Sequence, residues 1–233
     1  MSFAFKNAKQ LVERVLECAY FHGQRPAIPY VWVPGSKDTP LVVVLGENAS
    51  GKSFFRRVAT EVVRTNKIEA ISISMEGRKS MGVMGVFVYG SEEWEATGVN
   101  SIRTVITGIS TCKGRATPHV VVWDEPDLGC SEDAAASVGA ALAAFAREPG
   151  IHTKAMVVIT HRKALVERLA ALTPAPHYLF LGSVNGPPTL AAWLVRPPVV
   201  RPLEEIQKAG HRRFMAIQSI LDKLEKNRKR SRR

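Results

Sequence analysis

Eight consecutive residues after an apolar run have the types and spacing of a phosphate-binding loop. In the pattern Gly-x-x-x-x-Gly-Lys-Ser, Gly46 and Gly51 let the backbone turn closely and point its N–H groups inward. We expect Lys52 to reach the β- and γ-phosphates of a nucleotide, and the Ser53 hydroxyl to ligate Mg²⁺. A helix that starts near Ser53 adds the positive end of its dipole. The predicted nucleotide-binding residues are Gly46, Glu47, Asn48, Ala49, Ser50, Gly51, Lys52, Ser53 and Phe54.

A pair of carboxylates follows a second apolar run. Asp124 and Glu125 come directly after residues 120–123, Val-Val-Val-Trp. Ligands of α/β sheets bind at the carboxyl ends of the strands, so both side chains are expected beside the loop. Asp124 would hold magnesium directly or through water, and Glu125 would position or deprotonate the water that attacks the γ-phosphate. The alternative is an acidic loop that only caps a helix.

The segments that position these residues alternate between strand and helix patterns. Continuous apolar runs predict buried strands at 41–45 and 120–123, and further strands are expected at 68–75 and 156–160. Apolar residues at helical spacing predict helices at 3–20, 53–65, 99–110, 132–147, 162–171 and 203–226. A closing hairpin is expected from strands at 178–181 and 190–195, with Asn185-Gly186 in the turn. The alternation indicates an α/β fold of the P-loop NTPase type.

Three regions are expected along the chain. Residues 1–40 would form an N-terminal helix and a lead-in strand, and residues 41–200 the ATPase core. Residues 201–233 would form an amphipathic helix with a basic tail, and the apolar stripe of this helix is expected to pack on the core.

The carboxylate segment resembles that of the ATP-binding cassette (ABC) superfamily. Asp124-Glu125-Pro126 matches the family pattern, and residues 157–161 resemble the strand that ends in the family's switch histidine. The resemblance implies that His161 contacts the γ-phosphate and links Glu125, the water and a partner subunit. A histidine at a strand end, taken alone, is more often a surface or capping residue.

A second segment resembles a degenerate form of the family signature LSGGQ. Thr97 matches the serine, Gly98 the first glycine and Asn100 the glutamine, whereas Val99 replaces the second glycine. The resemblance implies that Thr97, Gly98 and Asn100 bind the nucleotide held by the other subunit of a dimer. The N-terminal end of a helix favours phosphate binding, because its free N–H groups and its dipole attract anions. The alternative to nucleotide binding is that Thr97 only caps the helix.

The sequence departs from the family pattern elsewhere. The family's D-loop aspartate aligns with Ser131 or with Glu132. No glutamine lies between residues 54 and 100, and Glu76 is the nearest polar substitute for the Q-loop residue. The spacing of 44 residues from Ser53 to Thr97 is much shorter than in transporter subunits. The resemblance covers residues 41–182.

These features favour an ABC-type ATPase that is not a transporter. Two chains would enclose two Mg-ATP molecules, and hydrolysis would drive a partner through a conformational cycle. A nucleotide-binding subunit of a membrane transporter is the first alternative, and the short middle region argues against it. A P-loop kinase for a small molecule is the second, with Arg78-Lys79 as the candidate lid.

Charge and composition bound the partners. The chain has 233 residues, a net charge of +11 and three scattered cysteines, and 23% of its residues are charged. Residues Lys226–Arg233 hold six of the basic side chains, which favours a nucleic-acid or nucleoprotein partner, or else a solvated tail. No apolar run is long enough to span a bilayer, and Lys6, Lys9 and Glu13 interrupt the segment where a signal peptide would be apolar. We expect a cytoplasmic protein with no membrane partner.

Overall fold

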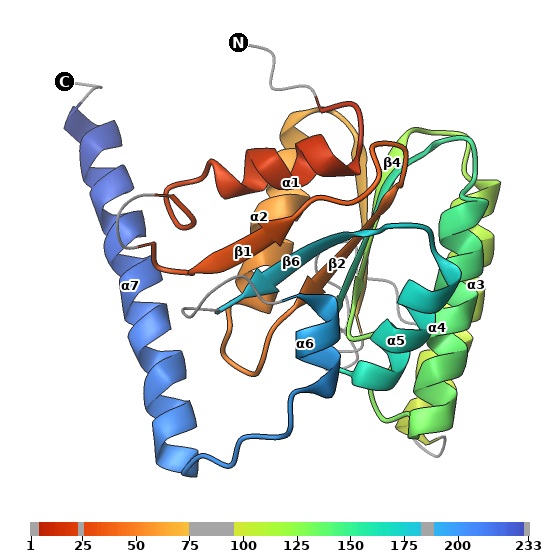
Figure 1. Cartoon of the computed structure of the whole chain (residues 1–233). Helices are drawn as coiled ribbons and strands as arrows, with labels where there is room; N and C mark the ends of the chain where they lie inside the picture. The colour runs from red at the N-terminus through yellow and green to blue at the C-terminus, as the bar shows by residue number, and fades with distance from the viewer. Residues whose placement is uncertain (1–4, 23–25, 75–95, 183–188, 231–233) are drawn as a thin grey trace.

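The chain folds around one six-stranded sheet (Figure 1). The computed structural model describes residues 5–22, 26–74, 96–182 and 189–230, with side chains up to residue 222. The strand order is β1-β6-β2-β5-β4-β3, and β1 is antiparallel to its neighbour while the other pairs are parallel. The strands are β1 (Tyr30–Val33), β2 (Leu41–Leu45), β3 (Glu69–Ser74), β4 (His119–Asp124), β5 (Thr153–Thr160) and β6 (His177–Leu181).

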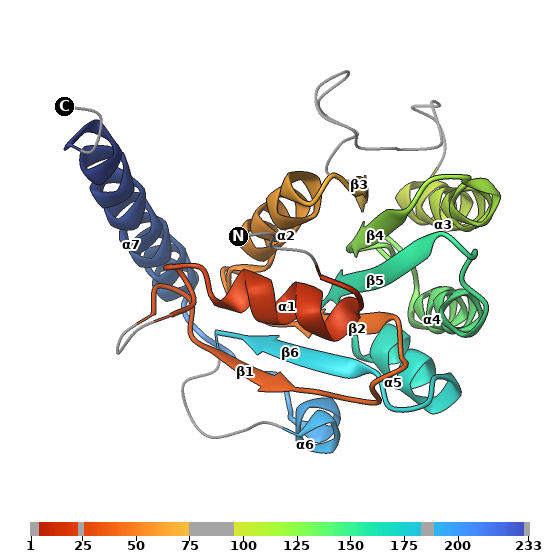
Figure 2. The same ribbon diagram turned by 90° about the horizontal axis from the view of Figure 1, so that it is seen from above.

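Helices cover both faces of the sheet (Figure 2). The helices are α1 (Ala8–Leu16), α2 (Lys52–Thr65), α3 (Thr97–Gly114), α4 (Glu132–Arg147), α5 (Lys163–Leu172), α6 (Leu190–Val195) and α7 (Leu203–Arg230). Residues of α1 and α2 pack on one face, and residues of α3, α4 and α5 pack on the other. The α/β fold predicted from the sequence is therefore confirmed.

Alternate residues of the central strands supply the two cores. Val42 and Val44 of β2 face the cluster of α1 and α2, whereas Val43 faces the cluster of α4 and α5. All five residues of β2 are fully buried, as expected for a parallel strand covered on both faces. On the α3 side, a Cβ on Gly108 would lie 2.7 Å from the Trp123 ring, so this glycine allows α3 to approach the sheet.

The predicted closing hairpin is wrong. Residues Leu190–Val195 form helix α6, and the antiparallel partner of β6 is β1. Thr189 begins α6, because its hydroxyl accepts a hydrogen bond from the Ala192 N–H at 3.1 Å. The predicted turn at Asn185-Gly186 lies outside the described residues, as do Glu76 and Arg78-Lys79.

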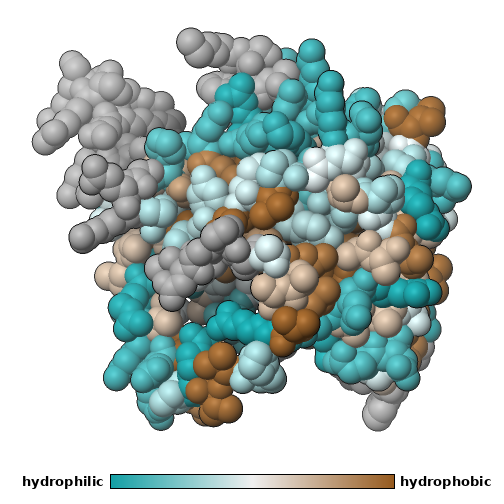
Figure 3. All heavy atoms as spheres, viewed as in Figure 1, coloured by the Kyte–Doolittle hydropathy of each residue, from teal (hydrophilic) through white to brown (hydrophobic). Residues whose placement is uncertain are grey.

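Helix α7 packs less closely than its apolar stripe predicts. Ile217 contacts the core cluster of α1 and α2, but Leu203 is 79% exposed and Phe214 is 59% exposed. The segment between α6 and α7 also exposes Val199 and Val200, and Figure 3 shows hydrophobic groups in that area of the surface. None of the helices within the described residues has the length and apolar character to cross a bilayer.

Candidate active site

The loop between β2 and α2 has the backbone geometry that its glycines predict. Gly51 has a φ of 103° and Ala49 a φ of 62°, so the chain turns through two left-handed residues before α2. A Cβ on Gly46 would lie 2.3 Å from the Ser50 Oγ, so the loop closes tightly on this residue. The N–H groups that follow lead into the first turn of α2, which is the arrangement that binds phosphate.

Lys52 extends back along this loop. The residue is 7% exposed. Its ammonium donates hydrogen bonds to the carbonyls of Gly46 at 2.8 Å and Glu47 at 3.1 Å. Burial lowers the pKa of Lys52, and the carboxylates of Glu125, Asp124 and Glu47 oppose that shift. The charge is therefore held at the loop by groups that phosphate oxygens can replace.

Glu125 lies at the end of β4 in a strained conformation. Its φ is 48°, and its N–H donates to the Ile159 carbonyl at 2.9 Å. The Glu125 Oε1 is 3.1 Å from His161 Nδ1 and 3.9 Å from Lys52 Nζ. The hydrogen bond from His161 is the largest cause of a lowered pKa at Glu125, and the charge of Lys52 adds to it while burial opposes it. The three predicted catalytic residues thus come together, with Glu125 ionised.

Asp124 has a partner that the sequence analysis did not foresee. Arg56 of α2 places its Nε 3.0 Å from the Asp124 Oδ2, and Asp124 is buried while Arg56 is 13% exposed. The Ser74 hydroxyl also donates to this carboxylate at 3.3 Å. Ser53, in contrast, is exposed on the first turn of α2 and fits a metal bound with a nucleotide. The metal role of Asp124 stays a prediction, and in this structure the guanidinium of Arg56 faces the same carboxylate.

Among the described residues, no cluster of three or more His, Cys, Asp or Glu side chains could hold a metal ion.

The predicted signature segment begins α3. Thr97 is the first helical residue and is exposed, while Ala96 takes the cap position without a side-chain bond, so the alternative of a cap at Thr97 is wrong. Gly98 packs against the loop after β4, where a Cβ would lie 2.6 Å from the Gly129 carbonyl. Asn100 is fully buried and faces the interior. Of the three predicted side chains, Thr97 alone stands at the surface.

Phe54 also points inward. Its ring lies edge-on to Tyr20, with 4.6 Å between the ring centroids, and belongs to the apolar contacts below α1. Phe54 would therefore contact a nucleotide through its backbone and not through its ring.

An arginine supports the carboxylate loop and was missed from sequence. Arg162 bonds to the Cys130 carbonyl at 2.7 Å and to Glu132 at 3.0 Å, and its Nε is 3.4 Å from Asp127. Asp127 also accepts from the Thr160 hydroxyl at 3.3 Å. Burial raises the pKa of Asp127, and the charge of Arg162 opposes that shift. This network ties the loop after β4 to the end of β5, next to His161.

Two arginines near the C-terminus contact the phosphate loop. Arg201 donates to the Glu47 carboxylate, and Arg196 lies 3.5 Å from the same group. Helix α7 continues along the loop, since a Cβ on Gly210 would be in contact with Ala49 at 3.4 Å. Arg201 and Glu47 are 154 residues apart, so no sequence spacing could reveal the pair.

The structure defines an α/β protein whose glycine-rich loop, lysine and carboxylate meet at one edge of the sheet. The chain matches no protein-family model and no curated protein. Among solved structures it is similar to EssC (ATPases 2 and 3) from Geobacillus thermodenitrificans, at 12% identity and a TM-score of 0.36. The match covers 68% of this chain and 34% of the other, so the chain spans about a third of the length of that protein. A likeness at this level carries no argument about function.

Proposed function

We propose that the chain is a P-loop ATPase of the ABC type that binds ATP at residues 46–54 and hydrolyses it. The meeting of Lys52, Glu125 and His161 at the carboxyl edge carries this proposal. These residues come from three segments of the chain. Together they supply the three groups that a phosphoryl-transfer site requires: a cation for the phosphates, a base for the water, and a group that orients the base.

The residues supply each part of the reaction. Lys52 exchanges the carbonyls of Gly46 and Glu47 for phosphate oxygens, which are stronger partners for an ammonium. Glu125 is ionised and accepts a proton from the attacking water. His161 fixes the carboxylate through Oε1, which leaves the second oxygen for the water. Magnesium, when bound with the nucleotide, would neutralise phosphate charge, and Ser53 is the residue that fits it.

The dimer and the partner belong to the same proposal. Two chains would enclose two ATP molecules, with the start of α3 facing the phosphates of the opposite subunit. The exposed position of Thr97 and the N-terminal turn of α3 support this arrangement. Since Asn100 is buried, the contact falls on Thr97 and on the backbone of Gly98. The basic segment Lys226–Arg233 supports a nucleic-acid or nucleoprotein partner.

Phosphate release by the purified protein tests the hydrolysis. Lys52→Ala should abolish turnover, and Glu125→Gln should retain ATP but lower the rate by about 10²–10⁴. Lys113→Ala and Glu61→Gln are matched controls, because both residues are exposed and lie outside the site. Turnover in Lys52→Ala that equals that of Lys113→Ala would overturn the proposal.

Light scattering tests the dimer. The Glu125→Gln variant with ATP should have twice the mass of the chain, and Glu125→Gln with Thr97→Asp should remain a monomer because the exposed position 97 would then place a carboxylate against phosphate. A monomer in both cases would limit the proposal to a single-chain ATPase.

A further inference from the structure

A cavity lies at the opposite end of the strands from the phosphate loop. Its volume is about 530 Å³, within the usual range for ligand sites. Pro40 precedes β2, Thr153 begins β5 and Pro174 precedes β6, so the cavity is at the amino ends of three neighbouring strands. The phosphate loop follows the carboxyl end of β2, and five strand residues span about 17 Å. The two sites are therefore separate.

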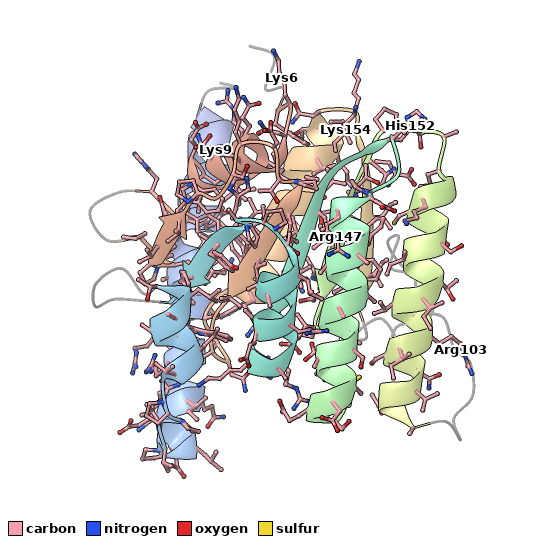
Figure 4. The ribbon with its side chains drawn as sticks, turned by 45° about the vertical axis from the view of Figure 1, so that its right-hand side comes forward. Lys6, Lys9, Arg103, Arg147, His152 and Lys154 are labelled. Atoms are coloured by element: carbon pink, nitrogen blue, oxygen red, sulfur yellow. The ribbon has the colours of Figure 1, made fainter. Side chains whose placement is uncertain are left out.

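Basic side chains from three elements line this cavity. Lys6 precedes α1, Arg147 ends α4 and Lys154 belongs to β5. Figure 4 shows Lys6 and Lys154 at the same edge of the molecule, with Arg147 below them. Asp38 is the one acidic residue among the lining residues that the structure describes. The lining thus has an excess of positive charge around an open hollow, which favours an anionic ligand.

These cations are available to a ligand. No ion pair joins Lys6 or Lys154 to another residue in the described part of the chain, and both are exposed. Arg147 uses one N–H for the Leu172 carbonyl at 3.2 Å, and a guanidinium has five in all. Asn7 begins α1 at the cavity wall, so the positive end of this helix dipole adds to the field.

We infer that this cavity binds a phosphate group of a ligand distinct from the nucleotide at residues 46–54. Arg147 provides a planar pair of donors that matches two phosphate oxygens, and Lys6 and Lys154 add point charges on either side. The phosphate belongs either to a small phosphorylated molecule or to a nucleic-acid strand. Both present the same oxygens to the same three cations, and the proposal does not depend on the hydrolysis proposed above.

Pyrophosphate binding tests the site directly. The probe is inorganic pyrophosphate, titrated calorimetrically into the full chain carrying Lys52→Ala, so that the loop at residues 46–54 does not take it. Lys6→Ala with Lys154→Ala should weaken binding about tenfold, since each exposed ion pair is worth up to about fivefold. Arg57→Ala with Lys208→Ala removes the same charge from exposed sites outside the cavity, and should change affinity less than twofold. Equal affinity in the two double variants, or no binding to the Lys52→Ala chain, would overturn the inference.

A second titration identifies the source of the phosphate. Fluorescence anisotropy of a labelled single-stranded oligonucleotide is measured against salt with the same variants. If the cavity holds a strand phosphate, loss of Lys6 and Lys154 should reduce the log–log salt slope by about 1.4. If the slope is unchanged while pyrophosphate affinity falls, the ligand is a small phosphorylated molecule. If neither quantity responds, the cavity is not a phosphate site.

Discussion

Substitution of Arg56 should reveal how the carboxylate at the end of β4 is stabilised. Arg56 and Asp124 form a buried ion pair at 3.0 Å, with side chains 13% and 6% exposed. Arg56→Met keeps most of the aliphatic volume but removes the charge, which leaves a buried carboxylate without its guanidinium. Breaking such a pair from one side costs about 3–5 kcal/mol. For a chain of this size the midpoint of thermal unfolding should fall by about 6–20 °C.

The assay is thermal unfolding at neutral pH, followed by circular dichroism. Arg57→Met is the matched control, because Arg57 is the next residue of α2 and is exposed; its midpoint should change by about 2 °C or less. Arg56→Met with Asp124→Asn should recover most of the loss, since an amide oxygen still accepts from Ser74 and carries no charge. If the double variant is as unstable as Arg56→Met alone, the loss comes from packing and the electrostatic argument is refuted.

Magnesium extends the same experiment to function. If Asp124 faces the metal of a bound nucleotide, Arg56 and the metal compete for one carboxylate. Magnesium should then raise the unfolding midpoint of Arg56→Met more than that of the wild type, because it supplies the missing positive charge. An equal response of the two proteins would show that Asp124 serves the fold and does not hold the metal.

Three further predictions concern other contacts of the site. Arg201→Ala should weaken ATP binding about threefold, because the negative charge of Glu47 beside the phosphates is then less neutralised. Adding Glu47→Ala to this variant should restore the affinity for ATP. A double variant that binds ATP more weakly than Arg201→Ala would contradict this. Gly98→Ala should cost about 1–3 kcal/mol in chemical denaturation, because its Cβ would lie 2.6 Å from a facing carbonyl, whereas Gly114→Ala, which meets nothing within 4 Å, should cost nothing. Since the folded pKa of Glu125 is lowered, its stabilising effect is present above its ordinary value of 4.5 and is lost as pH falls through the folded value. Glu125→Gln should therefore lose less stability than the wild type between about pH 5 and pH 3, and parallel losses would refute the shift.

Local patterns predicted much of the fold because they determine local structure. Helix α4 has the predicted bounds, and each end is marked in the sequence: the Ser131 hydroxyl accepts from the Ala134 N–H at 3.3 Å, and Arg147 stands in the last turn. The bounds of strand β2 could also be predicted, because a parallel strand buried on both faces needs apolar residues throughout. The segment at 190–195 misled because a run of six apolar residues suits either a strand or one short helix. The position beside β6 at the edge of the sheet is filled by β1.

The long-range contacts of the site had no such signal. The ion pair of Arg56 and Asp124 joins a helix to a strand that is two positions away from β2 in the sheet. Nothing in the spacing of these residues distinguishes Arg56 from the exposed Arg57. The same holds for Arg162, whose partners lie about 30 residues earlier in the chain. Such contacts follow from the strand order, and a single sequence does not state that order.

Strand order also explains why His161 belongs to the site. Strand β5 lies between β2, which leads into the phosphate loop, and β4, which ends at Asp124. Leu45 pairs with Thr160 on one side of β5, and Asp124 pairs with Ile159 on the other, so the three strands end at nearly the same level. The residue after β5 must then emerge between the loop and Glu125, where His161 stands 3.1 Å from the Glu125 carboxylate. The strained φ of Glu125 turns its side chain toward this position, and its N–H bond to the Ile159 carbonyl fixes that turn to β5. A carboxylate held by the neighbouring strand keeps its orientation, and a fixed orientation is what the proposed role of Glu125 as the base requires.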